Sequence, residues 1–363
     1  MCYAARHTLG GRGLKACVLH GLGDLRFEDA ATPTPRPGEV LLRVGACGVC
    51  GSDIPRVFTK GTYRFPTIPG HELSGTVVSI GVGVDHTLIG KTAAVFPLIP
   101  CRRCDACEIG AYAQCADYNY LGSRCDGGFA EFVTAPVWNL VMIPEGVSLE
   151  EAAMVEPAAV AMHALRRAGI DAGDTVLILG AGPIGLLVAL WARTWGAGRI
   201  LLTDIEDAKL GFAQSLGFSD THNPKSGDLG AWLKDRSGRG ADIVVEASGS
   251  SAAFEQAMGA ARTFGKVVLL GNPAGAMTLS QDAYWAILRK ELTVLGSWNS
   301  VYSNTPRNEW KLVLDSMASD KLDVKPLITH RIGLDGLSDA LVMLRDRTAF
   351  ANKVLFVSGS ADR

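Results

Sequence analysis

Hydrophobic positions follow two different patterns along the chain. From Lys15 to about Leu140, short alternating or β-branched runs such as KACVLHG, EVLLRVGACG and FAEFVTAP are interrupted by glycine and proline, which is typical of β-strands. From Leu149 the sequence becomes rich in alanine, EEAAMVEPAAVAMHALRRAG, and Gly169 ends this helical stretch. A β-rich region is therefore expected to give way to a helical one near this point.

Beyond Gly169 the pattern predicts strands that alternate with helices. Strands are expected at 175–180, 199–204, 242–247, 266–271 and 292–296, and helices at 183–195, 207–216 and 253–263. Apolar strands that are spaced by helices form parallel sheets with both faces covered. A final helix near 308–317 and the strand KVLFVSG are expected to return to the β-rich region.

The length of the chain, 363 residues, exceeds that of a usual single domain, so two domains are expected. The predicted fold class is α/β, with a discontinuous β-rich domain and a doubly wound parallel-sheet domain. Residues 1–14 are expected to form a flexible N-terminal extension. The β-rich domain would comprise residues 15–164 and 301–363, and the parallel-sheet domain residues 165–300.

Composition excludes several classes of protein. Hydrophobic residues make up 48% of the chain and charged residues 20%, as in a compact globular protein rather than a disordered one. A net charge of −2 provides no basic field that would attract nucleic acid. The chain has no apolar run of about eighteen residues and no apolar N-terminal signal, so neither a membrane span nor secretion is expected. A cytoplasmic protein is the expectation that follows.

A glycine-rich turn, GAGPIG, follows the apolar strand TVLIL and opens the next predicted helix. In this context it predicts the dinucleotide loop of a Rossmann domain, because glycines permit a sharp turn and close approach to a pyrophosphate. A glycine turn that binds no ligand is the alternative. The predicted cofactor-binding residues are Gly180, Gly182, Pro183, Ile184, Gly185 and Asp204.

Asp204 favours the dinucleotide-binding interpretation because it ends the strand that follows the loop. A carboxylate at this place accepts hydrogen bonds from the ribose hydroxyls and repels a 2′-phosphate. NAD is therefore expected rather than NADP. Lys209 is expected to be a solvated helix residue.

Four of the nine cysteines lie close together in the sequence. Their spacing is that of a closed structural zinc site, in which four thiolates surround the metal and leave no open position for chemistry. An iron–sulfur cluster is chemically possible, but the second set of cysteines that such proteins often have is missing. The predicted ligands of a structural zinc ion are Cys101, Cys104, Cys107 and Cys115.

Three shorter motifs accompany these sites. CGSD at 50–53 and GHE at 70–72 fall in the β-rich region, and the dipeptide EP at 156–157 lies at the entry to the helical region. Each is weak by itself, since a single cysteine or histidine is usually a core or surface residue. Taken in order with the four cysteines and GAGPIG, they resemble the zinc-containing medium-chain alcohol and polyol dehydrogenases, from about Lys15 to the C-terminus.

This resemblance implies a GroES-like fold for the β-rich domain and a catalytic zinc ion within it. The implied ligands are Cys50, His71 and Glu156. Glu72 would be a neighbour that can enter or exchange in the coordination sphere. The sequence does not decide which glutamate binds the metal.

The resemblance also implies roles for the two residues that follow in the CGSD motif. Ser52 would pass the proton of the alcohol outward, and Asp53 would orient a ligand imidazole. Zinc with three protein ligands leaves one position for a substrate hydroxyl, and hydride transfer to NAD then gives a ketone. Ser52, Glu72 and Asp53 are thus the predicted catalytic residues beside the zinc ligands.

A glutamate ligand is typical of the sorbitol-dehydrogenase branch, whose substrates are polyols. The runs CGSDIPRVF, PLIPCRRCDAC and LRKELTVLGSW resemble the polyol-phosphate dehydrogenases of this branch, which implies oxidation of galactitol 1-phosphate to tagatose 6-phosphate. Arg56 would bind the phosphate as a bidentate donor, with Lys60 and Arg124 as further candidates. A surface position is the alternative for Arg56. The alternative substrate is an unphosphorylated hexitol such as galactitol, altritol or glucitol.

Two rival classes are a metal-free reductase of the same superfamily and a non-catalytic NAD-binding sensor with the same fold. The first would not need the catalytic ligands, and the second would not keep them. The apolar strand LTVLG and Trp298 after it suggest pairing of subunits into a homodimer or homotetramer. The expected partner is a small polyol or polyol phosphate, with no nucleic acid and no membrane.

Replacement of one catalytic ligand tests the metal assignment. Cys50→Ala should abolish turnover but leave the dissociation constant for NAD nearly unchanged, because the two sites lie in different predicted domains. Absorbance at 340 nm follows turnover, and calorimetry measures NAD binding. A variant that retained full activity would contradict the assignment.

Overall fold

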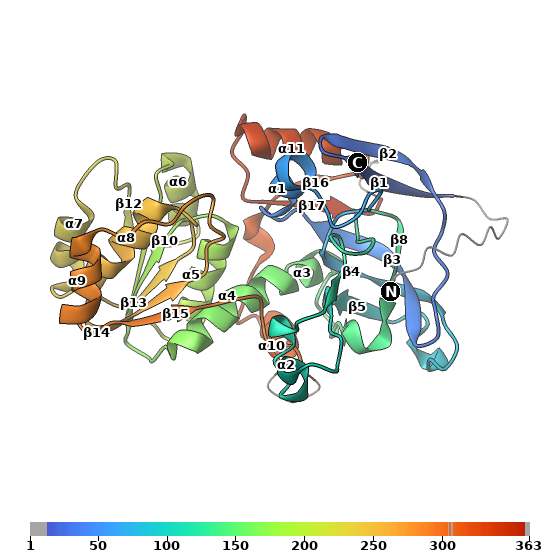
Figure 1. Ribbon diagram of the computed structural model, residues 1–363, viewed down its shortest axis with the longest axis horizontal. Coiled ribbons are helices and arrows are strands. Elements are labelled where there is room, and N and C mark those ends of the chain that lie inside the picture. The colour runs from blue at the N-terminus through green and yellow to red at the C-terminus, as the bar shows by residue number, and fades with distance from the viewer. Residues whose placement is uncertain (1–12, 304, 306–307, 360–363) are drawn as a thin grey trace. The chain divides into compact units, whose positions relative to one another are not determined.

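The computed structural model describes residues 13–303, 305 and 308–359 (Figure 1). Of the predicted N-terminal extension, residues 1–12 lie outside this range, and the first strand begins at Leu14. The chain divides into two compact units. The first comprises the described parts of 1–156, 301–319 and 327–363, and the second comprises 157–300 and 320–326.

The first unit is built mainly of β-strands. Most of its helices are short, and the two longer ones follow residue 308. The first two residues of α4 also belong to this unit. Its strands are β1 (Leu14–Gly21), β2 (Asp24–Ala30), β3 (Glu39–Gly48), β4 (Glu72–Ile80), β5 (Thr92–Val95), β6 (Leu98–Ile99), β7 (Asn119–Tyr120), β8 (Phe132–Pro136), β9 (Leu140–Met142), β16 (Ile328–Ile332) and β17 (Lys353–Val357). Its helices are α1 (Asp53–Pro55), α2 (Asp105–Glu108), α3 (Leu149–Ala153), α10 (Glu309–Ala318) and α11 (Leu337–Asp346).

A seven-stranded sheet forms the core of this unit, in the order β16-β17-β3-β4-β5-β9, with β8 also paired to β3. Strand β17 runs antiparallel to β3, and Leu355 lies opposite Gly48. The C-terminal segment therefore completes a sheet that the N-terminal part begins, and the first unit is discontinuous in sequence. The alternating side chains of β3, including Val40, Leu42 and Val44, are fully buried in the core.

The second unit contains a six-stranded parallel sheet in the order β12-β11-β10-β13-β14-β15. Its strands are β10 (Thr175–Leu179), β11 (Arg199–Thr203), β12 (Thr221–His222), β13 (Ala241–Glu246), β14 (Ala261–Leu269) and β15 (Thr293–Gly296). Its helices are α5 (Pro183–Thr194), α6 (Asp207–Ser215), α7 (Leu229–Ser237), α8 (Ser251–Ala260) and α9 (Gln281–Arg289), and α4 (Val155–Ala168) belongs to it from Pro157.

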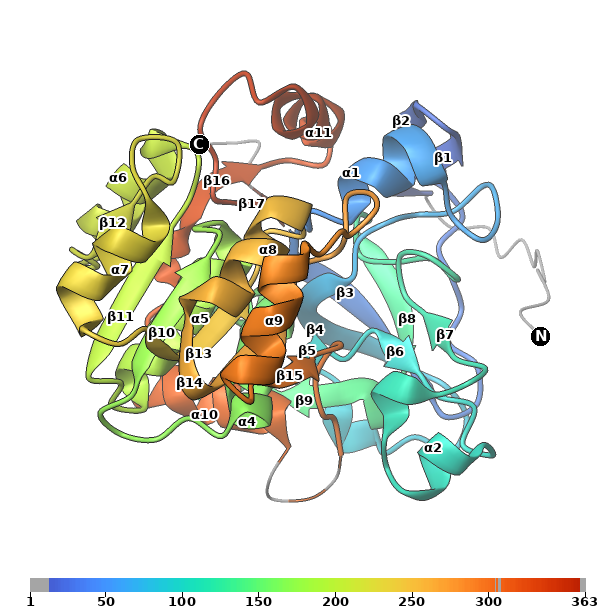
Figure 2. The same ribbon diagram turned by 60° about the vertical axis from the view of Figure 1, so that its left-hand side comes forward.

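Helices cover the faces of this parallel sheet, as the apolar strands require. Helices α7, α8 and α9 pack together on one face, which is turned toward the viewer in Figure 2. Trp191 of α5 is buried among other apolar residues, and its indole Nε1 donates to the carbonyl oxygen of Ala158 in α4 at 2.9 Å. The strand order reverses beside β10, as in Rossmann domains. The predicted α/β fold class, with a discontinuous β-rich unit and a doubly wound parallel-sheet unit, is confirmed.

The helix predicted at 253–263 differs from the structure. Helix α8 ends at Ala260, and Ala261 begins β14 opposite Ala241 of β13. Residues 261–263, which the helical pattern includes, therefore belong to a strand that pairs with its neighbour. The local sequence does not predict this pairing, because the partner strand is about twenty residues away.

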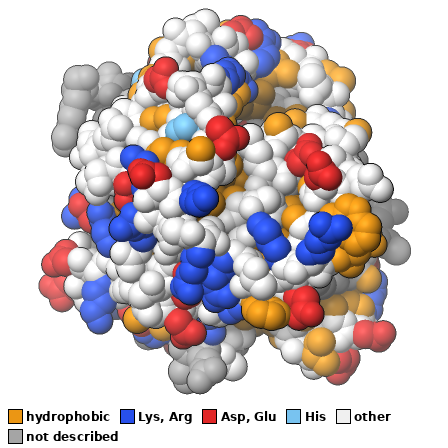
Figure 3. Space-filling view, turned by 90° about the vertical axis from the view of Figure 1, so that its left-hand side faces the viewer, with side chains coloured by type: hydrophobic (Ala, Val, Ile, Leu, Met, Phe, Trp, Pro, Cys, Tyr) orange, Lys and Arg blue, Asp and Glu red, His pale blue; other side chains and the backbone are white. Residues whose placement is uncertain are grey.

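Charged side chains are interspersed on the surface. Figure 3 shows acidic and basic groups side by side on the face of the second unit that it presents. This distribution agrees with the small net charge of −2. Among the described residues, every helix is too short or too polar to cross a lipid bilayer.

Glycines in the turn between β10 and α5 serve two purposes, a backbone conformation with positive φ and close packing. Gly180 has a φ of 111°, which favours glycine. A Cβ on Gly185 would lie 1.9 Å from the carbonyl oxygen of Gly180, so that this glycine is needed for close packing. A Cβ on Gly182 would meet nothing within 4 Å.

Two substitutions should separate these roles. Gly185→Ala should lower the free energy of unfolding of the cofactor-free protein by about 1–3 kcal/mol, because its Cβ would clash with backbone. Gly182→Ala is the matched control and should leave that free energy unchanged, yet weaken NAD binding by blocking the space that a pyrophosphate would occupy. Urea denaturation and calorimetry measure the two quantities. Equal destabilisation by both substitutions would contradict this division.

Candidate active site

Cys50, His71 and Glu72 form a compact group in the first unit. Their ligand atoms, one from each side chain, all lie within 4.8 Å of one another. The sheet explains the grouping, because Gly48 at the end of β3 lies opposite Glu72 at the start of β4. Cys50 follows the first strand by two residues, and His71 precedes the second by one.

Two glycines allow this close approach. A Cβ on Gly48 would lie 2.0 Å from Oε2 of Glu72. Gly70 has a φ of 97°, and a Cβ there would lie 2.8 Å from the backbone nitrogen of Phe129. Any larger residue at either position would therefore displace a side chain or a strand at the centre of the site.

Asp53 is fully buried and contacts both Cys50 and His71. Its Oδ2 accepts a hydrogen bond from the backbone N–H of Cys50 at 2.9 Å, and its Oδ1 lies 3.5 Å from Nδ1 of His71. Oδ1 is also paired with Arg56. Although burial opposes ionisation of Asp53, His71, Arg56 and the Cys50 N–H together lower its pKa to about 2.

His71 is almost completely buried, and its Nδ1 makes no hydrogen bond within the described residues. Burial opposes its protonation, but Asp53 and Cys50 raise the pKa of His71 well above its ordinary value. A buried imidazole between a carboxylate and a thiol is a common environment for a metal ligand. The orienting role of Asp53 stays a prediction, and the 3.5 Å separation between Oδ1 and Nδ1 is compatible with it.

Lys353 is a member of the site that sequence analysis missed. It lies on β17, and its Nζ donates to Oε2 of Glu72 at 2.5 Å and to the carbonyl oxygen of Val49 at 3.1 Å. Both charged side chains are nearly inaccessible to solvent. Burial would lower the pKa of Lys353, but Glu72 and the neighbouring acidic groups raise it. This cation therefore balances the charge of Glu72.

Glu156 lies close to this group but is not part of it. Its Oε1 lies 3.5 Å from the hydroxyl of Tyr120, whose ring packs against His71 at 5.8 Å between centroids. Burial, together with the negative charge of Glu72, raises the pKa of Glu156 to about 7, against the opposite influence of His71 and Lys353. The compact group thus contains Glu72, and the sequence had left open whether Glu72 or Glu156 ligates the metal.

The remaining predicted residues have different surroundings. Ser52 is half-buried at the start of α1, between Cys50 and Asp53. Arg56 was a candidate phosphate ligand, but its guanidinium is engaged by Asp53. Lys60 is exposed at the end of a short π-helix over Arg56–Lys60.

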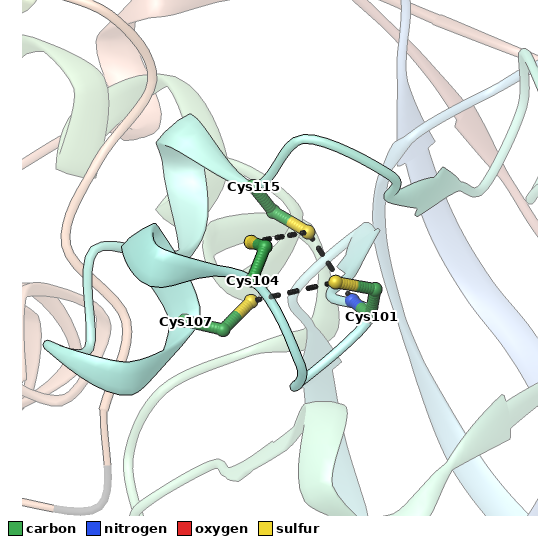
Figure 4. A group of neighbouring side chains, drawn as sticks. All are labelled: Cys101, Cys104, Cys107 and Cys115. Atoms are coloured by element: carbon green, nitrogen blue, oxygen red, sulfur yellow. Dashed lines mark hydrogen bonds between the residues drawn. The ribbon is translucent and has the colours of Figure 1, made fainter.

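The four predicted zinc ligands of the cysteine lobe come together (Figure 4). The sulfur atoms of Cys101 and Cys107 are 4.0 Å apart, and those of Cys104 and Cys115 are 3.9 Å apart. Four thiolates at about 2.3 Å from a tetrahedral zinc ion would be about 3.8 Å apart, so these distances fit the metal. Backbone N–H groups of Ala116 and Cys107 lower the pKa of Cys104 to about 6.

Aromatic contacts fix this lobe to the core of the first unit. Trp138 contacts Tyr112 of the lobe at 5.0 Å between centroids, and the guanidinium of Arg102 lies 4.5 Å from its ring. On its other side, Trp138 meets Tyr302 at 4.8 Å, and Tyr302 stacks on Phe96 at 4.3 Å. The lobe therefore depends on its cysteines internally and on Trp138 for attachment.

Asp204 lies at the glycine loop of the second unit, as predicted. Its Oδ2 accepts from the N–H of Ala181 at 2.9 Å, and its Oδ1 accepts from the N–H of Glu206 at 3.0 Å. The Nζ of Lys209 lies 2.9 Å from Glu206 and 4.0 Å from Asp204. Lys209 is therefore paired with acidic groups and is not simply a solvated helix residue. The carboxylate is thus fixed beside the loop.

Comparison with known proteins agrees with this geometry. The model described as the alcohol dehydrogenase GroES-like domain matches residues 36–145, and the zinc-binding dehydrogenase model matches residues 183–319. The chain belongs to the zinc-containing medium-chain polyol dehydrogenases. It is an oxidoreductase that acts on polyols.

Individual relatives are similar over nearly the whole length. Galactitol 1-phosphate 5-dehydrogenase of Escherichia coli (strain K12) is 35% identical over 350 residues, covering 95% of this chain and 100% of the relative. Sorbitol dehydrogenase of Bacillus subtilis (strain 168) is 32% identical, covering 92% and 94%. The crystal structure of galactitol-1-phosphate dehydrogenase from Escherichia coli superposes with a TM-score of 0.88 at 34% identity, covering 94% and 99%.

Metal analysis of two cysteine variants tests the lobe. Cys107→Ser should lose one zinc ion per chain and become more sensitive to proteolysis between 101 and 115, because the remaining ligands cannot close the loop. Cys125→Ser is the matched control, since Cys125 lies outside both metal-ligand groups, and it should keep the zinc content of the unmodified protein. Elemental analysis by mass spectrometry measures the metal. Unchanged zinc in Cys107→Ser would contradict a structural zinc site.

Proposed function

We propose that this protein oxidises a secondary hydroxyl of a polyol phosphate to a ketone and transfers the hydride to NAD. Galactitol 1-phosphate, giving tagatose 6-phosphate, is the favoured substrate. The compact group of Cys50, His71 and Glu72 is the observation that supports the reaction. The similarity to a galactitol 1-phosphate 5-dehydrogenase supports the substrate.

Two zinc ions per chain fit the donor sets of the first unit. One would be held by Cys50 and His71 with Glu72 or Glu156, and the other by the four thiols of the lobe. A sulfur, an imidazole nitrogen and a carboxylate oxygen are the ligand types of catalytic zinc, and four thiolates are those of structural zinc. When bound, the catalytic ion would lower the pKa of a substrate hydroxyl and orient it.

The protein's own residues would then handle the proton. Ser52 is half-buried two residues after Cys50, and its hydroxyl would accept the proton of the alcohol and pass it to solvent. If Glu72 ligates the metal, Glu156 is a second group beside the site that would take a proton, because burial and the charge of Glu72 raise its pKa. Asp53 would hold His71 in place during the reaction.

We assign Arg56 to positioning rather than to phosphate binding. Its guanidinium is paired with the buried carboxylate of Asp53 and is itself largely covered. A phosphate would have to compete with that carboxylate. Arg56 therefore helps to keep Asp53 ionised behind His71.

NAD is the proposed cofactor because of Asp204. Its carboxylate is fixed beside the glycine loop by the backbone N–H groups of Ala181 and Glu206. A 2′-phosphate there would meet the negative charges of Asp204 and Glu206, while Lys209 is already paired with Glu206. The arrangement therefore favours an unphosphorylated ribose.

A second copy of the chain is the proposed partner of the second unit. Strand β15 lies at the edge of the parallel sheet, and Val294 on it and Trp298 after it are 38% and 58% exposed. Edge strands with exposed apolar side chains favour pairing with another strand. Light scattering should therefore give the mass of a dimer or a tetramer, and the mass of a single chain would contradict this proposal.

The alternative substrate is an unphosphorylated hexitol such as galactitol, altritol or glucitol. The 32% identity with a sorbitol dehydrogenase supports this alternative. A non-catalytic NAD-binding sensor is less favoured, because Cys50, His71 and Glu72 lie together as a group that could hold a metal ion.

A substrate and cofactor panel tests the proposed function. The zinc-loaded protein should reduce NAD with galactitol 1-phosphate at a higher kcat/KM than with galactitol, altritol or glucitol, and should use NADP poorly. NADH formation at 340 nm provides the rates. Preference for a free hexitol would favour the alternative, and no turnover of any polyol or polyol phosphate would contradict the enzyme assignment.

A further inference from the structure

Arg124 lies between two tyrosine rings. Its guanidinium carbon is 4.2 Å from the ring centroid of Tyr63 and 4.2 Å from that of Tyr118. One of its nitrogens, Nη1, donates to the carbonyl oxygen of Tyr118 at 3.1 Å. The rings hold the guanidinium by its faces, which leaves the N–H groups at its edge to interact with a ligand.

The charge of Arg124 has no carboxylate partner within the described part of the chain. Neighbouring arginines do have one, since Arg64 pairs with Asp126 at 2.8 Å and Arg103 with Asp117 at 2.7 Å. In addition, the Nε of Arg124 is buried and has no hydrogen-bond partner within the described residues. A buried N–H without an acceptor is unfavourable, so the polar groups of Arg124 are incompletely satisfied by the described residues.

Aromatic contacts connect Arg124 to the candidate metal ligands. The ring of Tyr118 meets that of Tyr120 edge-on at 6.2 Å between centroids. Tyr120 in turn packs against His71 and lies beside Glu156. Arg124 follows Tyr120 by four residues in the turn after β7, and its N–H donates to the carbonyl oxygen of Tyr120 at 2.9 Å. Arg124 therefore contacts Tyr118, which contacts Tyr120, which contacts the candidate metal ligand His71.

The other predicted phosphate ligands are less suited to this role. Arg56 is engaged by Asp53, and Lys60 is an exposed side chain at the end of its helix. A flexible, exposed lysine provides a point charge without defined direction, whereas a clamped guanidinium provides a planar fork.

We propose that Arg124, held between Tyr63 and Tyr118, binds the anionic end of the substrate while the hydroxyl that reacts lies at Cys50 and His71. This inference rests on the proposed function and identifies the residue that determines its specificity. A phosphate ester and a carboxylate are both acceptors for the guanidinium fork, so that a polyol phosphate and an aldonate share the required chemistry. Tyr63 and Tyr118 act as positioning residues for the cation.

Kinetics of two Arg124 variants test the proposal. Arg124→Gln should lower kcat/KM for galactitol 1-phosphate by roughly 10- to 100-fold, mainly through a higher KM, because a charged hydrogen bond is lost in both ground and transition states. Arg124→Lys should give a smaller loss, since it keeps the charge but not the fork. Turnover of galactitol, which has no anionic end, should change less than about threefold.

The matched control is Arg345→Gln. Arg345 is also stacked on an aromatic ring of the first unit, Phe58 at 4.4 Å, but it is paired with Asp346. This variant should leave both kcat/KM values unchanged. D-Galactonate, which replaces the phosphate by a carboxylate, distinguishes the two sources of the anion by its relative kcat/KM.

A binding measurement without NAD separates this proposal from the proposed function. Galactitol 1-phosphate or D-galactonate should raise the Tm of the unmodified protein, and Arg124→Gln should remove that increase, which is measured for each protein against its own Tm without ligand. If the increase depends on Arg124 but no polyol is oxidised, the anion site stands and the proposed reaction fails.

Three results would overturn the role of Arg124. Retention of both the phosphate preference and the Tm increase in Arg124→Gln and Arg124→Lys would overturn the role of Arg124 and leave the proposed reaction intact. Equal losses of kcat/KM on galactitol and on galactitol 1-phosphate would show that Arg124 only supports the turn that it occupies. Absence of any Tm increase with either anion in the unmodified protein would also overturn it.

Discussion

The buried ion pair between Lys353 and Glu72 is the interaction on which the first unit depends most. The two residues are 281 positions apart, and they join the last strand of the chain to β4. An isolated charge in such a place would be strongly unfavourable, so each residue requires the other. The pair also fixes Glu72 beside Cys50 and His71. The strand that completes the sheet therefore also positions one residue of the candidate metal centre.

The other parts of the two sites are held by local devices. Gly48 and Gly70 provide the space in which strands and side chains approach, and Asp53 ties the Cys50 backbone to His71. The cysteine lobe has few apolar residues of its own and is attached through Trp138. A metal that binds four thiolates would contribute directly to its folding. In the second unit, one glycine permits the loop and another permits the packing of α5.

Features encoded in short stretches of sequence could be predicted. The glycine loop with Asp204, the four cysteines and most strands of the parallel sheet belong to this group, because their patterns are complete within a few residues. Lys353 could not be predicted, since its partner is distant in the sequence and a lysine is usually exposed. The pairing of Arg56 with Asp53 and the grouping of Glu72 with Cys50 and His71 also depend on side-chain positions. Helices α7, α9 and α11 were not predicted.

A double-mutant cycle on the ion pair tests this account most directly. Lys353→Met, Glu72→Gln and the double variant are compared with the unmodified protein by urea denaturation at one fixed zinc concentration. Lys353→Met should lower the free energy of unfolding by about 3–5 kcal/mol, because it leaves Glu72 buried without a counter-charge. The double variant should recover at least about 2 kcal/mol relative to the sum of the single effects. Single effects that are small and simply add would contradict the claim that this pair holds the site together.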